Sequence, residues 1–240
     1  MRANPYRIWI FLAFVFAPIL PSQAEFHTPK RDEYRVDKPV ETETDALPRV
    51  LLIGDSIMGG YFKVTQQLLS DEAAVFRHPG NAGDTRNGIK KLDQWLGDAK
   101  WDVIHFNWGL HDLCYRHPEA TVYGHRDKIN GTVSVPIDAY AENLEKLVLQ
   151  LKKTGAILVF ATTTRIPEGE AGRFAGDEIR YNQVALPIME KHDIAVNDLY
   201  TLSKHFGPKM YVKPGDVHHT GKANKKLAEA VAKAILKQLD

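Results

Sequence analysis

Cysteine is almost missing from this chain of 240 residues, in which Cys114 is the single example. One cysteine cannot form a disulfide within the chain, so the fold must be stabilised by its hydrophobic core. An excess of charge is also missing, because 31 basic and 30 acidic residues leave a formal net charge of +1. No overall field therefore attracts nucleic acid or an anionic membrane, and the sequence predicts neither as a partner.

The apolar run near the N-terminus, residues 8–20, falls short of the roughly 20 residues that a membrane-spanning helix needs. Two arginines precede this run, and small residues follow it at Ser22 and Ala24. This order is typical of a secretory signal peptide, which we predict over residues 1–24 with cleavage before Glu25. The mature protein would then be secreted or periplasmic, without stable membrane insertion; an uncleaved anchor is the alternative.

Residues 25–47 are polar and charged and show no periodicity. We interpret them as an arm or linker rather than as part of a core. The remaining residues, 48–240, contain no internal repeat and no low-complexity tract. Their number suits one hydrophobic core, so we expect a single domain there.

Short runs rich in β-branched and aromatic residues, each bounded by Gly, Pro, Asn or Asp, predict strands at 49–54, 73–78, 101–108, 155–164 and 193–198. Helices are expected around 61–70, 85–96, 137–153, 177–191 and 222–239. Strands that alternate with helices indicate a three-layer α/β/α sandwich around a five-stranded parallel sheet. Pro187 falls inside one predicted helix, residues 113–135 have no clear assignment, and the strand order cannot be read.

The stretch LLIGDSIMGG, residues 51–60, follows the first predicted strand and lacks the signatures of three common loops. A Walker phosphate loop needs a lysine that is absent, and a dinucleotide loop needs a glycine where Ser56 stands. The nucleophile elbow of α/β-hydrolases needs a glycine where Met58 stands. The stretch therefore indicates no nucleotide cofactor, and from this stretch alone Ser56 could simply cap a helix.

Residues 54–57, GDSI, resemble the first motif of the SGNH, or GDSL, hydrolase family of serine esterases. Three later stretches resemble its other motifs in the same order: HPGNAGDTRNG at 78–88, NWGLHDL at 107–113 and KPGDVHHTGK at 213–222. The resemblance covers roughly residues 49–239. It implies the flavodoxin-like fold of that family, no cofactor, and Ser56 as the nucleophile in the turn after the first strand.

The second and third motifs imply an oxyanion hole. The resemblance assigns the backbone N–H groups of Ser56 and Gly83 to it, although two glycines and two asparagines also make an ordinary turn. Family members usually carry Gly-x-Asn-Asp in the third motif, whereas this chain has His111 in place of the asparagine. An imidazole N–H can replace the amide donor, and Asn107 offers another amide nearby. His111 could instead hydrogen-bond a loop carbonyl.

The fourth motif leaves the catalytic base open. Counting Asp-x-x-His literally gives Asp216 and His219, whereas the downstream Thr220 and Leu-Ala pair match the family spacing if the base is His218. We favour His218, with His219 as the alternative and Asp216 as the acid that orients it. Adjacent histidines on an extended segment point in opposite directions, so a shared metal ion is not expected.

Together with the predicted signal peptide, the resemblance implies an exported serine esterase that hydrolyses acyl esters, acetyl esters above all, on a small molecule or a polysaccharide. The alternatives are a non-catalytic glycan-binding relative and a lysophospholipase or thioesterase. Further substrate contacts are predicted for Asp55, Asn107, Trp108, Asp112 and Arg165, with Tyr115 and Arg86 as weaker candidates. The polar segment 116–136 is expected at the mouth of the site, where loops set specificity.

Overall fold

The structure is a computed structural model that describes residues 47–240. The predicted signal peptide, 1–24, and the predicted arm as far as residue 46 lie outside the described residues. Within the described part, no helix is long and apolar enough to cross a membrane.

Five parallel strands form the central sheet in the order β2-β1-β3-β6-β7. They are β1 (Arg49–Ile53), β2 (Ala74–Arg77), β3 (Val103–Phe106), β6 (Ile157–Ala161) and β7 (Ala195–Asn197). All five predicted strands are confirmed, and their order is that of a flavodoxin-like doubly wound sheet. In such a sheet the ligand site lies at the carboxyl ends of the strands where the winding reverses, here between β1 and β3.

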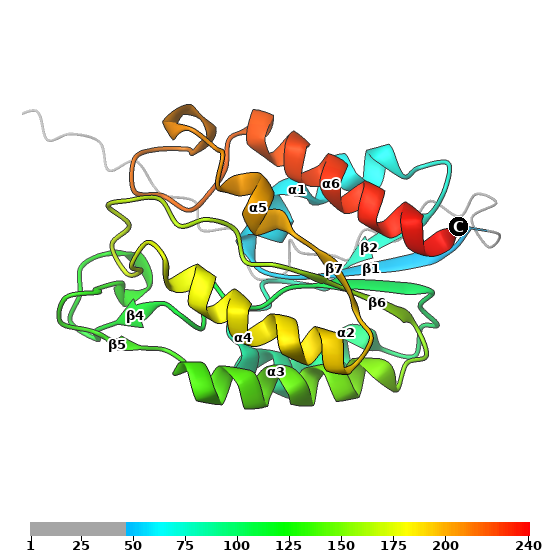
Figure 1. Cartoon of the computed structure of the whole chain (residues 1–240), viewed down its shortest axis with the longest axis horizontal. Coiled ribbons are helices and arrows are strands. Elements are labelled where there is room, and N and C mark those ends of the chain that lie inside the picture. The colour runs from blue at the N-terminus through cyan, green and yellow to red at the C-terminus, as the bar shows by residue number, and fades with distance from the viewer. Residues whose placement is uncertain (1–46) are drawn as a thin grey trace, which may run out of the picture. The chain divides into compact units, whose positions relative to one another are not determined.

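Helices cover both faces of the sheet (Figure 1), as the alternating pattern predicts. On one face lie α1 (Ser56–Leu68), α5 (Leu199–Ser203) and α6 (Gly221–Leu239). On the other lie α2 (Thr85–Leu96), α3 (Ile137–Lys152) and α4 (Asp177–Lys191), the last with Pro187 inside it. The short α5 was not predicted, and α1 begins five residues before the expected start at residue 61.

The central strands are buried on both faces, which explains why they read as continuous apolar runs rather than as alternating ones. Val50 to Ile53 of β1 and all four residues of β3 are almost fully buried. The register pairs Ile53 with Phe106, and Phe106 in turn with Phe160. The three strands therefore end close to one level, and the residues that follow them meet at a single edge.

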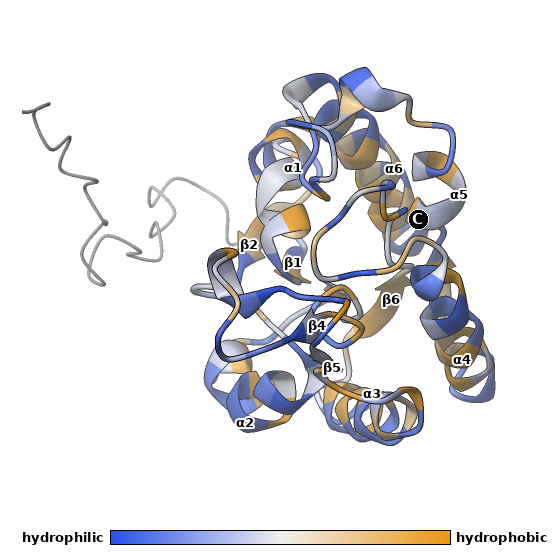
Figure 2. Ribbon diagram, turned by 90° about the vertical axis from the view of Figure 1, so that its left-hand side faces the viewer, coloured by the Kyte–Doolittle hydropathy of each residue, from blue (hydrophilic) through white to orange (hydrophobic). Residues whose placement is uncertain are grey.

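The segment without a predicted assignment forms a small antiparallel pair, β4 (Tyr115–Arg116) with β5 (Thr132–Val133), joined through the 3-10 turn η2 (Tyr123–His125). Figure 1 places this pair at the left end of the molecule, beyond the carboxyl ends of the sheet strands. Figure 2 views the molecule from that edge. The β4–β5 pair therefore lies at the carboxyl edge of the sheet, and a place at the mouth of the site stays a prediction for residues 116–136.

Candidate active site

Ser56 is the first residue of α1 and follows β1 after a two-residue turn. Asp55 caps the helix, because its Oδ1 accepts a hydrogen bond from the N–H of Ile57 at 2.8 Å. Gly54 permits the tight turn, since a Cβ added there would lie 2.7 Å from Cβ of Met58. The serine thus stands at the positive end of a 13-residue helix.

A chain of three side chains connects Ser56 to the loop before α6. The Oγ of Ser56 lies 2.9 Å from Nε2 of His218. The Nδ1 of the same ring lies 2.6 Å from Oδ1 of Asp216, which also accepts the backbone N–H of His218 at 2.9 Å. A serine hydroxyl, an imidazole and a carboxylate in this order form the arrangement of a serine hydrolase triad.

The carboxyl group of Asp216 is held in its charged form. Partial burial raises its pKa, but hydrogen bonds from the backbone and ring of His218 more than offset this effect, so that the pKa is lowered overall. An ionised Asp216 fixes the proton of His218 on Nδ1 and leaves Nε2 free to accept the proton of Ser56.

His219 faces away from Ser56 and into the protein. Its ring packs against Tyr211 and Phe206, with centroid distances of 5.2 and 5.5 Å. Neither ring nitrogen has a hydrogen-bond partner within the described residues, and burial lowers the pKa of His219 to about 4. Successive side chains on an extended segment point to opposite sides, and this segment brings His218, not its neighbour, to Ser56.

The second motif lies directly beside the turn that carries Ser56. The N–H of Ala82 donates to the carbonyl of Gly54 at 3.0 Å, and Gly83 is the next residue. However, the N–H of Gly83 donates to Oδ1 of Asn81 at 2.8 Å, a contact that the sequence did not predict. Gly83 can therefore serve an oxyanion only if this hydrogen bond is shared or exchanged. The N–H of Ser56, at the start of a helix, has no intrahelical acceptor.

His111 follows β3 and lies beside the helix cap. Its Nε2 is 3.9 Å from Oδ2 of Asp55, and about a quarter of its side chain is exposed, 27%. Burial lowers the pKa of His111 and Arg173 and Arg116 lower it further, while Asp55 acts in the opposite direction. His111 is therefore neutral at neutral pH, and one ring nitrogen carries an N–H that can be donated.

Three of the predicted substrate contacts are wrong, and the first two are Trp108 and Asn107, whose side chains are engaged by other parts of the protein. Trp108 is only 1% exposed and packs on α2, where a Cβ added to Gly88 would lie 2.8 Å from its ring. Asn107 donates its amide to the carbonyl of Ala161 at 2.7 Å. Neither Trp108 nor Asn107 can therefore present its ring or amide to a sugar or an oxyanion as the sequence predicted.

Asp112 is also not a substrate contact, since it is fully buried. Its Oδ1 accepts the backbone N–H of Thr85 at 2.9 Å and the hydroxyl of Thr85 at 2.6 Å. Burial raises the pKa of Asp112 to about 7. The residue ties the loop after β3 to the start of α2, so its role is structural.

We expect Asp112 to contribute a part of the unfolding free energy that is lost as the pH rises from 5 to 8. Its folded pKa of about 7 exceeds its ordinary value of 3.8, so the folded state keeps a proton that the unfolded state has lost. Relative to Asp112→Asn, the wild type should lose on the order of 2 kcal/mol of unfolding free energy over this range. Urea unfolding at both pH values measures the difference.

Comparison with Asp112→Asn also cancels the effects of the other titratable groups. Buried histidines with lowered pKa values, such as His105 and His219, lower the unfolding free energy of the protein as the pH falls. They do so equally in the wild type and in Asp112→Asn. The buried amide of the variant adds an offset that does not depend on pH. An identical pH dependence of the two proteins would contradict the assignment to Asp112.

The remaining candidates, Arg165, Arg86 and Tyr115, have separate contacts. Arg165 lines a cavity of about 340 Å³ between the segments 165–168 and 206–215. Arg86 is largely exposed and pairs with Asp84 at 2.6 Å. Tyr115 packs edge-on against Phe174 at a centroid distance of 5.3 Å. None of these three side chains is hydrogen-bonded to Ser56 in the part of the chain that the structure describes.

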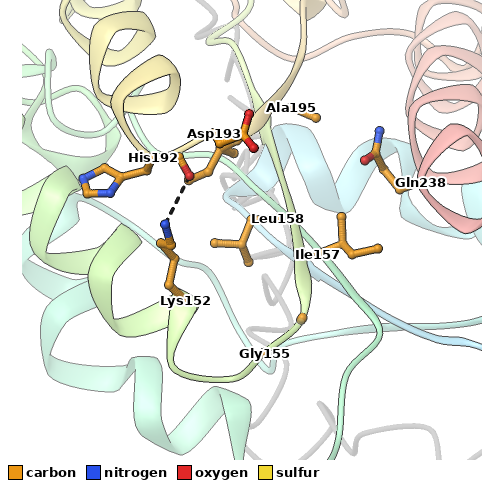
Figure 3. A pocket seen from close by; sticks show the side chains of 10 residues that line it. Lys152, Gly155, Ile157, Leu158, His192, Asp193, Ala195 and Gln238 are labelled. Atoms are coloured by element: carbon orange, nitrogen blue, oxygen red, sulfur yellow. Dashed lines mark hydrogen bonds between the residues drawn. The ribbon is translucent and has the colours of Figure 1, made fainter.

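A larger cavity, of about 640 Å³, lies at the opposite edge of the sheet and is shown in Figure 3. Its walls come from the starts of β6 and β7 and from the ends of α3 and α4, and Lys152 Nζ donates to the carbonyl of His192 at 3.2 Å. This cavity contains none of the four motifs. Among residues 47–240, no group of three or more His, Cys, Asp or Glu side chains is placed to hold a metal ion.

Glu170 and Arg173 are two buried charged residues at the carboxyl edge that the sequence analysis missed. They follow β6 in an irregular segment, outside the four motifs. Charged residues in loops are usually solvated, so only their burial distinguishes them. Their contacts are described below.

The described residues have the SGNH hydrolase fold, as predicted: a five-stranded parallel sheet with helices on both faces, with the GDS turn after the first strand. No protein-family profile matches the sequence. No curated protein matches it either.

Several solved structures are similar in fold to this chain. A lipase/acylhydrolase from Enterococcus faecalis is 17% identical, with 80% of this chain and 97% of that chain covered and a TM-score of 0.65. An acetyl xylan esterase from Geobacillus stearothermophilus is 18% identical, with 80% and 94% covered and a TM-score of 0.59. A candidate SGNH hydrolase from Slackia heliotrinireducens is 16% identical, with 79% and 99% covered and a TM-score of 0.58. At these identities the similarity establishes the fold.

Proposed function

We propose that this protein is an exported serine esterase that removes acyl groups, in particular acetyl groups, from carbohydrate. The observation that carries the proposal is the hydrogen-bonded chain from Ser56 through His218 to Asp216, with distances of 2.9 and 2.6 Å. The chain lies at the carboxyl edge of the sheet, where doubly wound folds hold their ligands.

In the proposed reaction, His218 takes the proton of Ser56 as the hydroxyl oxygen attacks the ester carbonyl. The proton then passes from His218 to the leaving alcohol, and the acyl group stays on Ser56. Water attacks this acyl-enzyme, with His218 again as the base, and the carboxylic acid leaves. Asp216 keeps the imidazole oriented in both steps.

The oxyanion that forms in both steps needs donors close to Ser56. We assign three donors to this role: the N–H of Ser56, the ring N–H of His111 and the N–H of Gly83. The N–H of Gly83 can donate to the oxyanion only after it releases Oδ1 of Asn81. Each donor of this kind contributes about 3 kcal/mol to the stability of the transition state. A neutral His111 can donate without bringing a full positive charge next to Ser56.

Two observations support acetylated carbohydrate as the substrate. Acetyl xylan esterases are among the solved structures with this fold. In addition, the segment 116–136 at the same edge is polar, with several basic side chains. A polar entrance suits a hydrated sugar chain better than an aggregated lipid.

The experiment that tests the function is acetate release from p-nitrophenyl acetate and from acetylated xylan, with Ser56→Ala as the blank. We expect the wild type to release acetate from both substrates. If the protein cleaves a lysophospholipid or a long-chain acyl-CoA faster than either acetyl ester, the lysophospholipase or thioesterase alternative is favoured. If turnover equals that of the blank on every ester, the esterase proposal fails and glycan binding becomes the better explanation.

Export is part of the proposal and is tested separately. It is supported by the two arginines, the apolar run and the small residues that precede Glu25. We expect intact-mass measurement of the protein from its producing cells to give a chain that begins at Glu25. Recovery of the whole chain with Met1 from the cytoplasm would contradict export and leave the esterase proposal untouched.

A further inference from the structure

A buried ionic cluster lies at the same edge as Ser56. Glu170 is fully buried, and its Oε1 accepts hydrogen bonds from Nη1 of Arg126 at 2.8 Å and from Nη1 of Arg173 at 2.9 Å. Its Oε2 accepts the backbone N–H of Gly172 at 2.6 Å. One carboxylate thus binds two cationic side chains from different segments.

Arg173 connects this cluster to the loop that carries His111. Its Nε donates to the carbonyl of Leu110 at 2.7 Å, and Leu110 directly precedes His111. The side chain is only 5% exposed. Two nitrogens of one planar guanidinium therefore donate to different partners, which a lysine ammonium on a flexible stem cannot reproduce with the same geometry.

Arg126 connects the cluster to the segment between β4 and β5. The backbone of this segment also docks on residues 171 and 172, because Lys128 N–H donates to Ala171 at 2.9 Å and Tyr115 N–H donates to Gly172 at 2.7 Å. The approach is close enough to require a glycine: a Cβ added to Gly172 would lie 2.8 Å from Cβ of Arg126.

Such a cluster adds little net stability. The desolvation of two cations and one anion offsets most of their attraction, and well-packed apolar side chains would stabilise the fold about as well. What apolar side chains cannot do is fix two backbone segments at defined hydrogen-bond distances. The geometry that the cluster imposes is therefore its main consequence.

We propose that the Arg126–Glu170–Arg173 cluster has two positioning roles: Arg173 holds His111 in place for the oxyanion, and Arg126 docks the β4–β5 segment as the recognition element for a polymeric substrate. The kinetic part of this inference rests on the proposed esterase function. Neither arginine contacts the reacting atoms.

Arg173→Lys tests the first role, because it keeps the charge and removes the fork geometry. A donor that moves by about 1 Å can cost about 100-fold in rate. We expect kcat to fall about 10- to 100-fold on p-nitrophenyl acetate and on acetylated xylan alike, with little change in KM. An unchanged kcat would overturn the positioning of His111.

Arg126→Met tests the second role, because it keeps the length of the side chain and removes its ion pair. We expect the ratio of kcat/KM on acetylated xylan to kcat/KM on p-nitrophenyl acetate to fall about tenfold, as expected for loss of one binding contact worth about 1.4 kcal/mol. In Arg173→Lys the same ratio should stay constant. An equal loss on both substrates would overturn the recognition role.

Arg180→Met is the matched control. Arg180 forms an exposed ion pair with Asp177 at 3.3 Å on α4, away from the cluster. This variant should leave both kinetic constants and the unfolding free energy unchanged. Unfolding is measured for all three variants, so that a loss of folded protein is not mistaken for a loss of rate.

A readout independent of activity separates this inference from the esterase proposal. The ring signals of His111 in NMR spectra, assigned with His111→Gln, report the surroundings of the imidazole, namely Asp55, Asp84, Arg116 and Arg173. We expect these signals and their titration to change in Arg173→Lys and to stay constant in Arg180→Met. Unchanged signals in Arg173→Lys would overturn the positioning role even if the wild type is an active esterase, and changed signals would support it even if no ester is cleaved.

Discussion

Replacement of Ser56 by alanine is expected to lower kcat/KM for acetate release by about 10⁵-fold. Alanine removes the oxygen that attacks the ester, while the oxyanion donors remain and leave only a slow attack by water. The fold should not suffer, because the helix cap is Asp55 rather than Ser56. We expect the unfolding free energy to change by less than about 0.5 kcal/mol. Initial rates and urea unfolding of the same preparations measure both effects.

Ser70→Ala is the matched control for this experiment. Ser70 is exposed near the end of α1, where its hydroxyl lies 3.4 Å from Oδ1 of Asp71. Its replacement should change neither rate nor stability. Acetate release by Ser56→Ala at the wild-type rate would exclude Ser56 as the nucleophile and with it the proposed mechanism.

Replacement of His218 by alanine is expected to be about as damaging, with a loss of roughly 10⁵-fold in kcat/KM. Without the imidazole, no base lies within hydrogen-bond distance of Ser56 Oγ in the described structure, since His218 Nε2 at 2.9 Å is its only hydrogen-bond partner there. A serine hydroxyl is a weak nucleophile when it keeps its proton. Rates over a range of pH, compared with those of Ser56→Ala, measure the loss.

His219→Ala should give the opposite result. Its ring fills space between Tyr211 and Phe206, so that the loss creates a cavity and lowers the unfolding free energy by about 1–3 kcal/mol. Well below its melting temperature the variant should keep most of its activity. If His219→Ala loses activity as His218→Ala does while remaining folded, the assignment of the base to His218 is contradicted.

The start of α1 shows where local patterns and tertiary structure diverge. The sequence predicts a helix around residues 61–70, and Gly59 and Gly60 just before it have low helix propensity. In the structure the cap by Asp55 begins the helix at Ser56. A Cβ added to Gly60 would lie 3.0 Å from the side chain of Asn224 in α6, so the glycine permits close packing of the two helices. Tertiary packing therefore contributes more to the stability of the first turns of α1 than intrinsic helix propensity does.

The structure brings the predicted Ser56, His218 and Asp216 within hydrogen-bond distance of one another, but it buries other predicted site residues. Trp108 and Asp112 were predicted as substrate contacts because they belong to the third motif. Both are buried in the loop that follows β3, where the ring of Trp108 packs against Gly88 of α2 and Asp112 accepts hydrogen bonds from Thr85 at the start of the same helix. Sequence spacing places a residue near the end of a strand, but it does not determine whether the side chain faces solvent.

The sequence by itself determined the layers of the fold, the five strands and the turn that carries Ser56, because periodicity, capping and turn chemistry are local properties of neighbouring residues. Only the tertiary structure decided that His218 rather than His219 reaches Ser56, which lies 162 positions earlier in the chain. It also brought Glu170 together with Arg126 and Arg173. Such contacts depend on how strands and loops pack in space, and the pattern of one segment contains no record of its distant partner.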